Sequence, residues 1–136
     1  MIIDKQTLFS DEQAITADAA STNVYDTGST ADVGPGNPIQ VFAQIMEAFN
    51  NLTSLDIKLQ TSTDEAFSSP ITLQTVSMLL AALTAGAKVS LSTLPEGCKR
   101  YLRLYYDVTG TDPTTGKITA GLVLDRQANT PTADAI

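Results

Sequence analysis

Residues 97–110, GCKRYLRLYYDVTG, alternate apolar and polar side chains more regularly than any other part of the chain. Successive side chains of a β-strand point to opposite faces, so one face carries an apolar set and the other a mixed set, namely Leu102, Leu104, Tyr106 and Val108 against Tyr101, Arg103, Tyr105 and Asp107. A second alternating run, residues 117–126, follows after a connection of six residues. The short connection predicts a long antiparallel hairpin. Because a two-stranded ribbon cannot bury one face in water, this hairpin requires a second layer of strands.

Further alternating runs supply that layer. Strands are predicted at 39–47 and 53–62, which we expect to cover the hairpin, and shorter strands at 71–75 and 89–91. The sequence does not decide between a short helix and a strand for residues 76–85, VSMLLAALTA. Met, Leu and Ala favour helices, whereas the neighbouring segments are extended. Short strands separated by turns predict an all-β fold, an antiparallel β-sandwich that is jelly-roll-like.

The length of 136 residues fits a single domain, 1–136. Residues 1–38 are small, polar and acidic, and we interpret them as a polar N-terminal arm with edge segments that ends at the Gly-Pro-rich loop 34–38. The sandwich core is predicted to cover 39–126, and 127–136 is interpreted as a loose tail.

The charge balance argues against a nucleic-acid partner. Fifteen Asp and Glu residues face eight Lys and Arg residues, so the net charge of -7 would repel a phosphate backbone. The start of the chain lacks the features of a secretion signal, and the longest apolar run, 78–83, is far shorter than the roughly 20 residues of a membrane-spanning helix. We therefore expect a protein that is made in a cytoplasm and has no membrane partner.

Catalytic and cofactor motifs are weak. The chain has no histidine and one cysteine, Cys98, which removes the commonest general base and metal ligand. Residues 110–118, GTDPTTGKI, resemble a phosphate-binding loop, but the glycine spacing is wrong and the segment joins two predicted strands. Asp107 and Asp112 lack the alternating oxygen ligands of a calcium loop. We expect no enzyme, no cofactor and no metal.

Lys99, Arg100 and Arg103 form the only basic cluster in this acidic chain. Arg103 projects from the mixed face of its strand, between Tyr101 and Tyr105. Two interpretations stay open: a surface ion pair with an acid of a neighbouring strand, or a contact to an acidic partner.

Several segments together resemble the Bbp16 family of bacteriophage capsid cement proteins. The resemblance follows the chain in order through FSDEQAITADAASTNVYDTG (9–28), VGPGNPI (33–39), LDIKLQTSTDEAFSSPITL (55–73), RYLRLYYDVTGT (100–111) and GKITAGLVLDRQ (116–127). Its most specific pieces are the ASTNV segment, the AFSSP loop and the RYLRLYY strand. No single piece would suffice alone.

The resemblance implies a jelly-roll-like capsid cement or decoration protein, a structural protein of the virion. Such a protein lies on the outer capsid surface, is synthesised in the bacterial host cytoplasm, forms a homodimer and ties neighbouring major capsid protein subunits together. Phe9, Tyr25, Arg103 and Tyr105 are the candidate contacts to the shell or to a second copy. Replacing Phe9 with Ala is then expected to weaken shell binding and to leave the isolated fold intact. The alternative function is a small ligand- or carbohydrate-binding sandwich, although the chain has no tryptophan.

Overall fold

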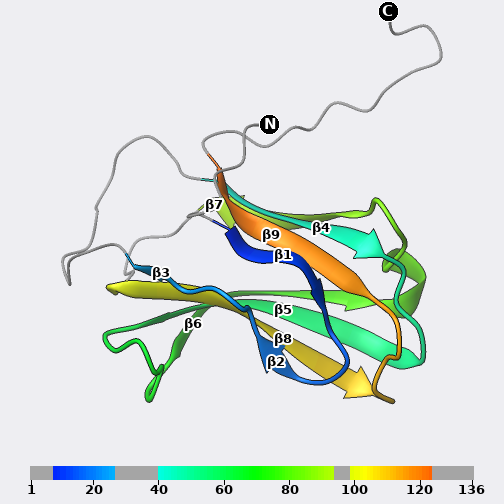
Figure 1. The fold of residues 1–136 in the computed structure, drawn as a ribbon, viewed down its shortest axis with the longest axis horizontal. Helices are drawn as coiled ribbons and strands as arrows, with labels where there is room; N and C mark the ends of the chain where they lie inside the picture. The colour runs from blue at the N-terminus through cyan, green and yellow to red at the C-terminus, as the bar shows by residue number, and fades with distance from the viewer. Residues whose placement is uncertain (1–7, 27–39, 94–98, 124–136) are drawn as a thin grey trace, which may run out of the picture.

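The computed structural model describes residues 8–26, 40–93 and 99–123, which fold into two antiparallel β-sheets that lie face to face (Figure 1). The all-β sandwich prediction is confirmed. The elements are β1 Leu8–Ala14, β2 Ala19–Ala20, β3 Tyr25–Asp26, β4 Gln40–Glu47, β5 Leu52–Ser62, β6 Ile71–Leu79, the 3-10 turn η2 Leu80–Ala82, β7 Lys88–Thr93, β8 Tyr101–Gly110 and β9 Lys117–Val123.

The strand order is that of a jelly roll. One sheet, called here the β9 sheet, has the order β1-β9-β4-β7, and the other, the β8 sheet, has the order β2-β8-β5-β6 with β3 also paired to β8. The pairs are nested along the chain: β5 with β6, β4 with β7, β2 and β3 with β8, and β1 with β9. Nested pairing of this kind, folded over into two sheets, produces the double Greek key of a jelly roll.

The predicted hairpin of residues 97–110 and 117–126 is wrong. β8 pairs with β5 on one side and with β2 and β3 on the other, whereas β9 pairs with β1 and β4 in the opposite sheet. The six residues 111–116 therefore cross between sheets, which is within reach because six extended residues span about 20 Å and stacked sheets lie about 10 Å apart. The strands predicted at 39–47 and 53–62 do not form one covering layer, because β4 joins β9 and β5 joins β8.

The core lies between the two sheets and confirms the predicted faces of β8. Leu102, Leu104 and Tyr106 have no exposed surface, and the remaining large buried side chains come from both sheets, including Val41, Ile45, Leu55, Ile57, Leu59, Ile118 and Leu122. Burial of such side chains supplies about 2 kcal/mol each. The sandwich therefore holds together through the inward faces of its strands.

The N-terminal segment contributes more than the predicted arm. β1, β2 and β3 are edge segments of the two sheets, but Phe9 and Ile15 have no exposed surface and belong to the main hydrophobic cluster. Residues 1–7 and 27–38 of the predicted arm and the tail 127–136 lie outside the described residues, as does Cys98.

Residues 76–85 combine the two alternatives that the sequence left open. β6 continues to Leu79, and a single 3-10 turn follows at Leu80–Ala82. Gly86, with φ +85°, then donates its backbone N–H to Ile45 in β4 and returns the chain to the β9 sheet. The apolar run therefore changes sheet here.

A hydrogen-bond network ties β1 to the β8 sheet. The hydroxyls of Tyr106 and Ser10 share a buried hydrogen bond of 2.7 Å, and Ser10 Oγ donates to Gln13 Oε1 at 2.6 Å. Gln13 in turn donates to the carbonyl of Ala20 and accepts from the backbone N–H of Thr22, both at 3.0 Å. The network therefore connects β1 and β8, which belong to different sheets.

Replacing Tyr106 with Phe should lower the free energy of unfolding near neutral pH by about 1 kcal/mol, because Ser10 loses a buried partner. Burial raises the pKa of Tyr106 above its usual value of 10.0, so the folded chain holds the phenol proton more tightly than the unfolded chain does. The stability that the protonated Tyr106 contributes is complete below pH 10.0. Above that pH, proton loss from the unfolded chain lowers the wild-type free energy of unfolding by about 1.4 kcal/mol per pH unit.

Denaturant unfolding near neutral pH and above pH 10 should therefore show the difference between wild type and Tyr106→Phe shrinking to zero within about one pH unit above pH 10 and then changing sign. Tyr101→Phe, on the outward face of the same strand, controls for the loss of a tyrosine. A difference that stays constant across this pH range would contradict the effect of burial on Tyr106.

The crossing loop depends on a glycine. Gly116 has φ +133°, and a Cβ atom placed there would lie 2.5 Å from Cδ2 of the buried Phe49 ring. The segment that resembled a phosphate-binding loop therefore joins two strands, and its second glycine makes room for an aromatic side chain.

Gly116→Ala should lower the free energy of unfolding by about 3 kcal/mol, because it combines a steric clash with an unfavourable left-handed backbone. Gly86→Ala is the matched control: Gly86 also has a positive φ, but nothing lies within 4 Å of its Cβ position, so only the backbone cost of about 1 kcal/mol applies. Equal losses in the two variants, measured by denaturant unfolding, would show that Phe49 does not restrict position 116.

Candidate functional site

The outward surface of the β8 sheet carries a cluster of aromatic and polar side chains, called here the Arg103 face. It consists of Gln60, Phe67, Tyr101, Arg103 and Tyr105. Gln60 and Arg103 lie directly opposite each other on β5 and β8, and Tyr101 and Tyr105 share the outward parity of Arg103. Phe67 comes from the β5–β6 connection, which turns away from the sandwich near the end where β8 begins (Figure 1).

Hydrogen bonds to Asp64 hold the connection that carries Phe67. The Asp64 carboxylate accepts from the Ser62 hydroxyl at 2.7 Å, from the Ser68 hydroxyl at 2.7 Å and from the Ser68 backbone N–H at 3.2 Å. Hydrogen bonds from Ser68 and then Ser62 lower the pKa of Asp64. The loop is therefore fixed by its own side chains.

Phe67 adopts a backbone conformation that is unfavourable for a bulky residue, with φ +53°. Its backbone N–H donates to the carbonyl of Asp64 at 3.1 Å, and its side chain is only 5% exposed although it does not belong to the core cluster between the sheets. The loop thus places an aromatic ring against the outside of the β8 sheet.

Arg103 is held on three sides. Its Cζ atom lies 4.2 Å from the centre of the Phe67 ring and 5.5 Å from that of Tyr105, and its Nε donates to Gln60 Oε1 at 2.9 Å. Partial burial lowers the pKa of Arg103. Stacking of this kind fixes the plane of the guanidinium group.

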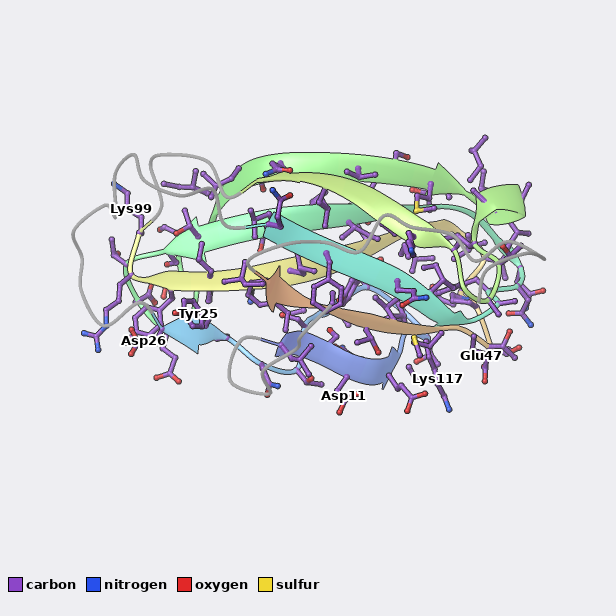
Figure 2. All side chains as sticks on the ribbon, turned by 90° about the horizontal axis from the view of Figure 1, so that it is seen from above. Asp11, Tyr25, Asp26, Glu47, Lys99 and Lys117 are labelled. Atoms are coloured by element: carbon purple, nitrogen blue, oxygen red, sulfur yellow. The ribbon has the colours of Figure 1, made fainter. Side chains whose placement is uncertain are left out.

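Three other basic side chains in the described part of the chain form ion pairs with carboxylates. Arg100 holds Asp26 through two contacts of 2.9 and 3.1 Å, Lys58 Nζ lies 2.9 Å from Asp107 Oδ2, and Lys117 Nζ lies 4.0 Å from Glu47 Oε2. Figure 2 places Asp26 and Lys99 at one end of the sandwich and Glu47 and Lys117 at the opposite end. The bond to Asp26 raises the pKa of Arg100. The ion-pair interpretation of the basic cluster therefore holds for Arg100, while Arg103 faces the neutral Gln60.

Among the described residues, no group of three or more His, Cys, Asp or Glu side chains is placed to hold a metal ion. Within the same residues, no helix is long and apolar enough to cross a membrane.

The sequence model of the Bbp16 family matches residues 9–122, which is most of the chain. The chain belongs to the Bbp16 family. A search of curated proteins finds no match.

The segments that carried the resemblance to the Bbp16 family meet in space. In the ASTNV segment, Ser21 accepts from the backbone N–H of Leu104 at 3.1 Å and donates its own backbone N–H to the Leu104 carbonyl at 2.8 Å. In the AFSSP loop, Phe67 stacks on Arg103 of the RYLRLYY strand. The ASTNV segment and the AFSSP loop therefore both contact β8.

The structure brings together two of the four candidate contact residues. Arg103 and Tyr105 share the Arg103 face, whereas Tyr25, on β3, is half-buried and packs against the core opposite Leu102. The sequence did not single out Gln60 and Phe67 as contacts. Phe67 had a signal in the AFSSP loop, but the position of Gln60 opposite Arg103 depends on strand register.

Phe9 is not available as a contact in this fold. Its side chain has no exposed surface, so the expectation that Phe9→Ala leaves the isolated fold intact is corrected.

Phe9→Ala should instead lower the free energy of unfolding of the isolated protein by about 3–5 kcal/mol, because the truncation leaves a cavity in the core. Denaturant unfolding of the purified protein measures this loss. A variant as stable as the wild type would contradict the position of β1 against the core.

Proposed function

We propose that the chain is a capsid cement or decoration protein that binds the outer surface of a bacteriophage shell and stabilises contacts between major capsid protein subunits. Membership of the Bbp16 family carries the proposal. The fold is compatible with it, because a rigid two-sheet sandwich presents fixed surfaces and a structural attachment needs no catalytic group.

The Arg103 face is the contact surface of the proposed function. It combines aromatic and arginine side chains, which are enriched at protein interfaces. Its position on the outside of the β8 sheet leaves the core between the sheets undisturbed when a partner docks.

Self-association, as a homodimer, makes the attachment multivalent. Each subunit then needs only a modest interface, because linking two weak contacts raises the overall strength of attachment far above that of one contact. The net charge of -7 disfavours a role in contacting packaged nucleic acid.

Quantitative mass spectrometry of purified particles from the source of this chain tests the proposal. A cement protein should be present in on the order of hundreds of copies per particle. Its copy number should be in a simple ratio to that of the shell protein, because it follows the shell symmetry. Absence from particles, or a handful of copies, would overturn the proposal. Effort would then pass to the alternative, a carbohydrate- or ligand-binding sandwich, tested by thermal stabilisation with a glycan panel.

A further inference from the structure

Some N–H groups of the Arg103 guanidinium have no hydrogen-bond acceptor in the part of the chain that the structure describes. Its one hydrogen bond uses Nε, which donates to Gln60. The described ion pairs involve Lys58, Arg100 and Lys117 and not Arg103. The two terminal nitrogens, Nη1 and Nη2, therefore remain available to an external acceptor.

The orientation of Arg103 is set before any partner arrives. The Cζ atom of Arg103 lies over the rings of Phe67 and Tyr105, and the hydrogen bond to Gln60 fixes Nε. The unfavourable φ of Phe67 is stabilised by the hydrogen bonds around Asp64, and local strain maintained in this way is typical of binding sites. A guanidinium group held in a fixed plane is suited to bidentate contact with a planar anion.

The surrounding charges favour a carboxylate on a protein over other anions. The loop that carries Phe67 contains Asp64, whose carboxylate is occupied by hydrogen bonds from Ser62 and Ser68. On the outward face of β8 the nearest acid in sequence is Asp107, four residues from Arg103 and bound to Lys58. Four residues of strand span about 13 Å, which exceeds the Debye length at physiological ionic strength. Arg103 is thus a local positive site on a chain of net charge -7, which opposes extended polyanions such as nucleic acids.

We infer that Arg103 is the anchor for an Asp or Glu side chain of the major capsid protein, whose carboxylate docks on Nη1 and Nη2 between Phe67 and Tyr105. This inference rests on the proposed function and names the chemistry of the partner at the Arg103 face.

The test measures binding of the full-length chain to empty shells of the source phage that lack it, by cosedimentation over a range of chain concentrations. Arg103→Gln should bind about 10- to 100-fold more weakly than wild type, because the charged hydrogen bonds to the carboxylate are lost. Arg103→Lys keeps the charge but not the planar fork, and should bind about 10-fold more weakly. If Arg103→Gln does not melt cooperatively, Arg103→Lys is the variant that tests the inference.

Arg100→Gln is the matched control, since it removes the same charge from the same end of β8 but from a side chain already paired with Asp26. It should bind shells as wild type does. Amidation of shell carboxylates with a carbodiimide and glycinamide, on shells that stay intact by electron microscopy, should reduce wild-type binding to the level of Arg103→Gln and should leave Arg103→Gln unchanged.

Wild-type binding that is matched by both Arg103 variants would overturn the inference and leave the proposed function standing. Failure of the wild-type chain to bind shells would overturn the proposed function, and the inference with it. If Arg103→Gln instead abolishes self-association in light scattering and binds shells normally, the carboxylate belongs to a second copy, and the assignment to the shell protein is wrong.

Discussion

Burial of one face of β8 against the opposite sheet is the constraint on which the remaining structure depends. β8 is hydrogen-bonded on both sides, by β5 along its length and by β2 and β3 on the other edge. Its inward residues Leu102, Leu104 and Tyr106 are fully buried. Because side chains alternate along a strand, this burial directs Arg103 and Tyr105 outward. The alternation of side chains along β8 therefore accounts both for its part of the core and for the Arg103 face.

The sequence predicted the faces of β8 but not its neighbours. Alternation is a local property, so the inward and outward sets could be assigned from residues 101–108 alone. Pairing partners are decided by segments far away: β2 and β3 are two residues each, yet they occupy the edge of β8 that a hairpin with β9 would have used. For the same reason the segment around Phe9, which is preceded by Leu8 and followed by the polar residues 10–13, did not reveal that Phe9 lies in the core.

The basic cluster illustrates a second limit of sequence reasoning. Arg100 and Arg103 are three residues apart, and both were open to an ion pair or an external contact. Strand register decides against an ion pair for Arg103 with β5, because the residue opposite Arg103 is the neutral Gln60. The acid of β5, Asp56, lies opposite Asp107 instead. Register across β5 and β8 depends on how the intervening strands cross between sheets. Composition and spacing contain no information on that crossing.

A fixed arginine suits attachment to a repetitive surface. Ordering a long side chain on binding costs roughly 2 kcal/mol of conformational entropy, and Arg103 has already lost much of that freedom through its contacts with Phe67, Tyr105 and Gln60. More of each charged contact is then available as binding free energy. If the chain binds a shell as a dimer, as proposed, small gains per subunit would multiply because a shell offers many identical positions. The strained backbone at Phe67 is a local cost that, in the proposed function, prepares the Arg103 face for its partner.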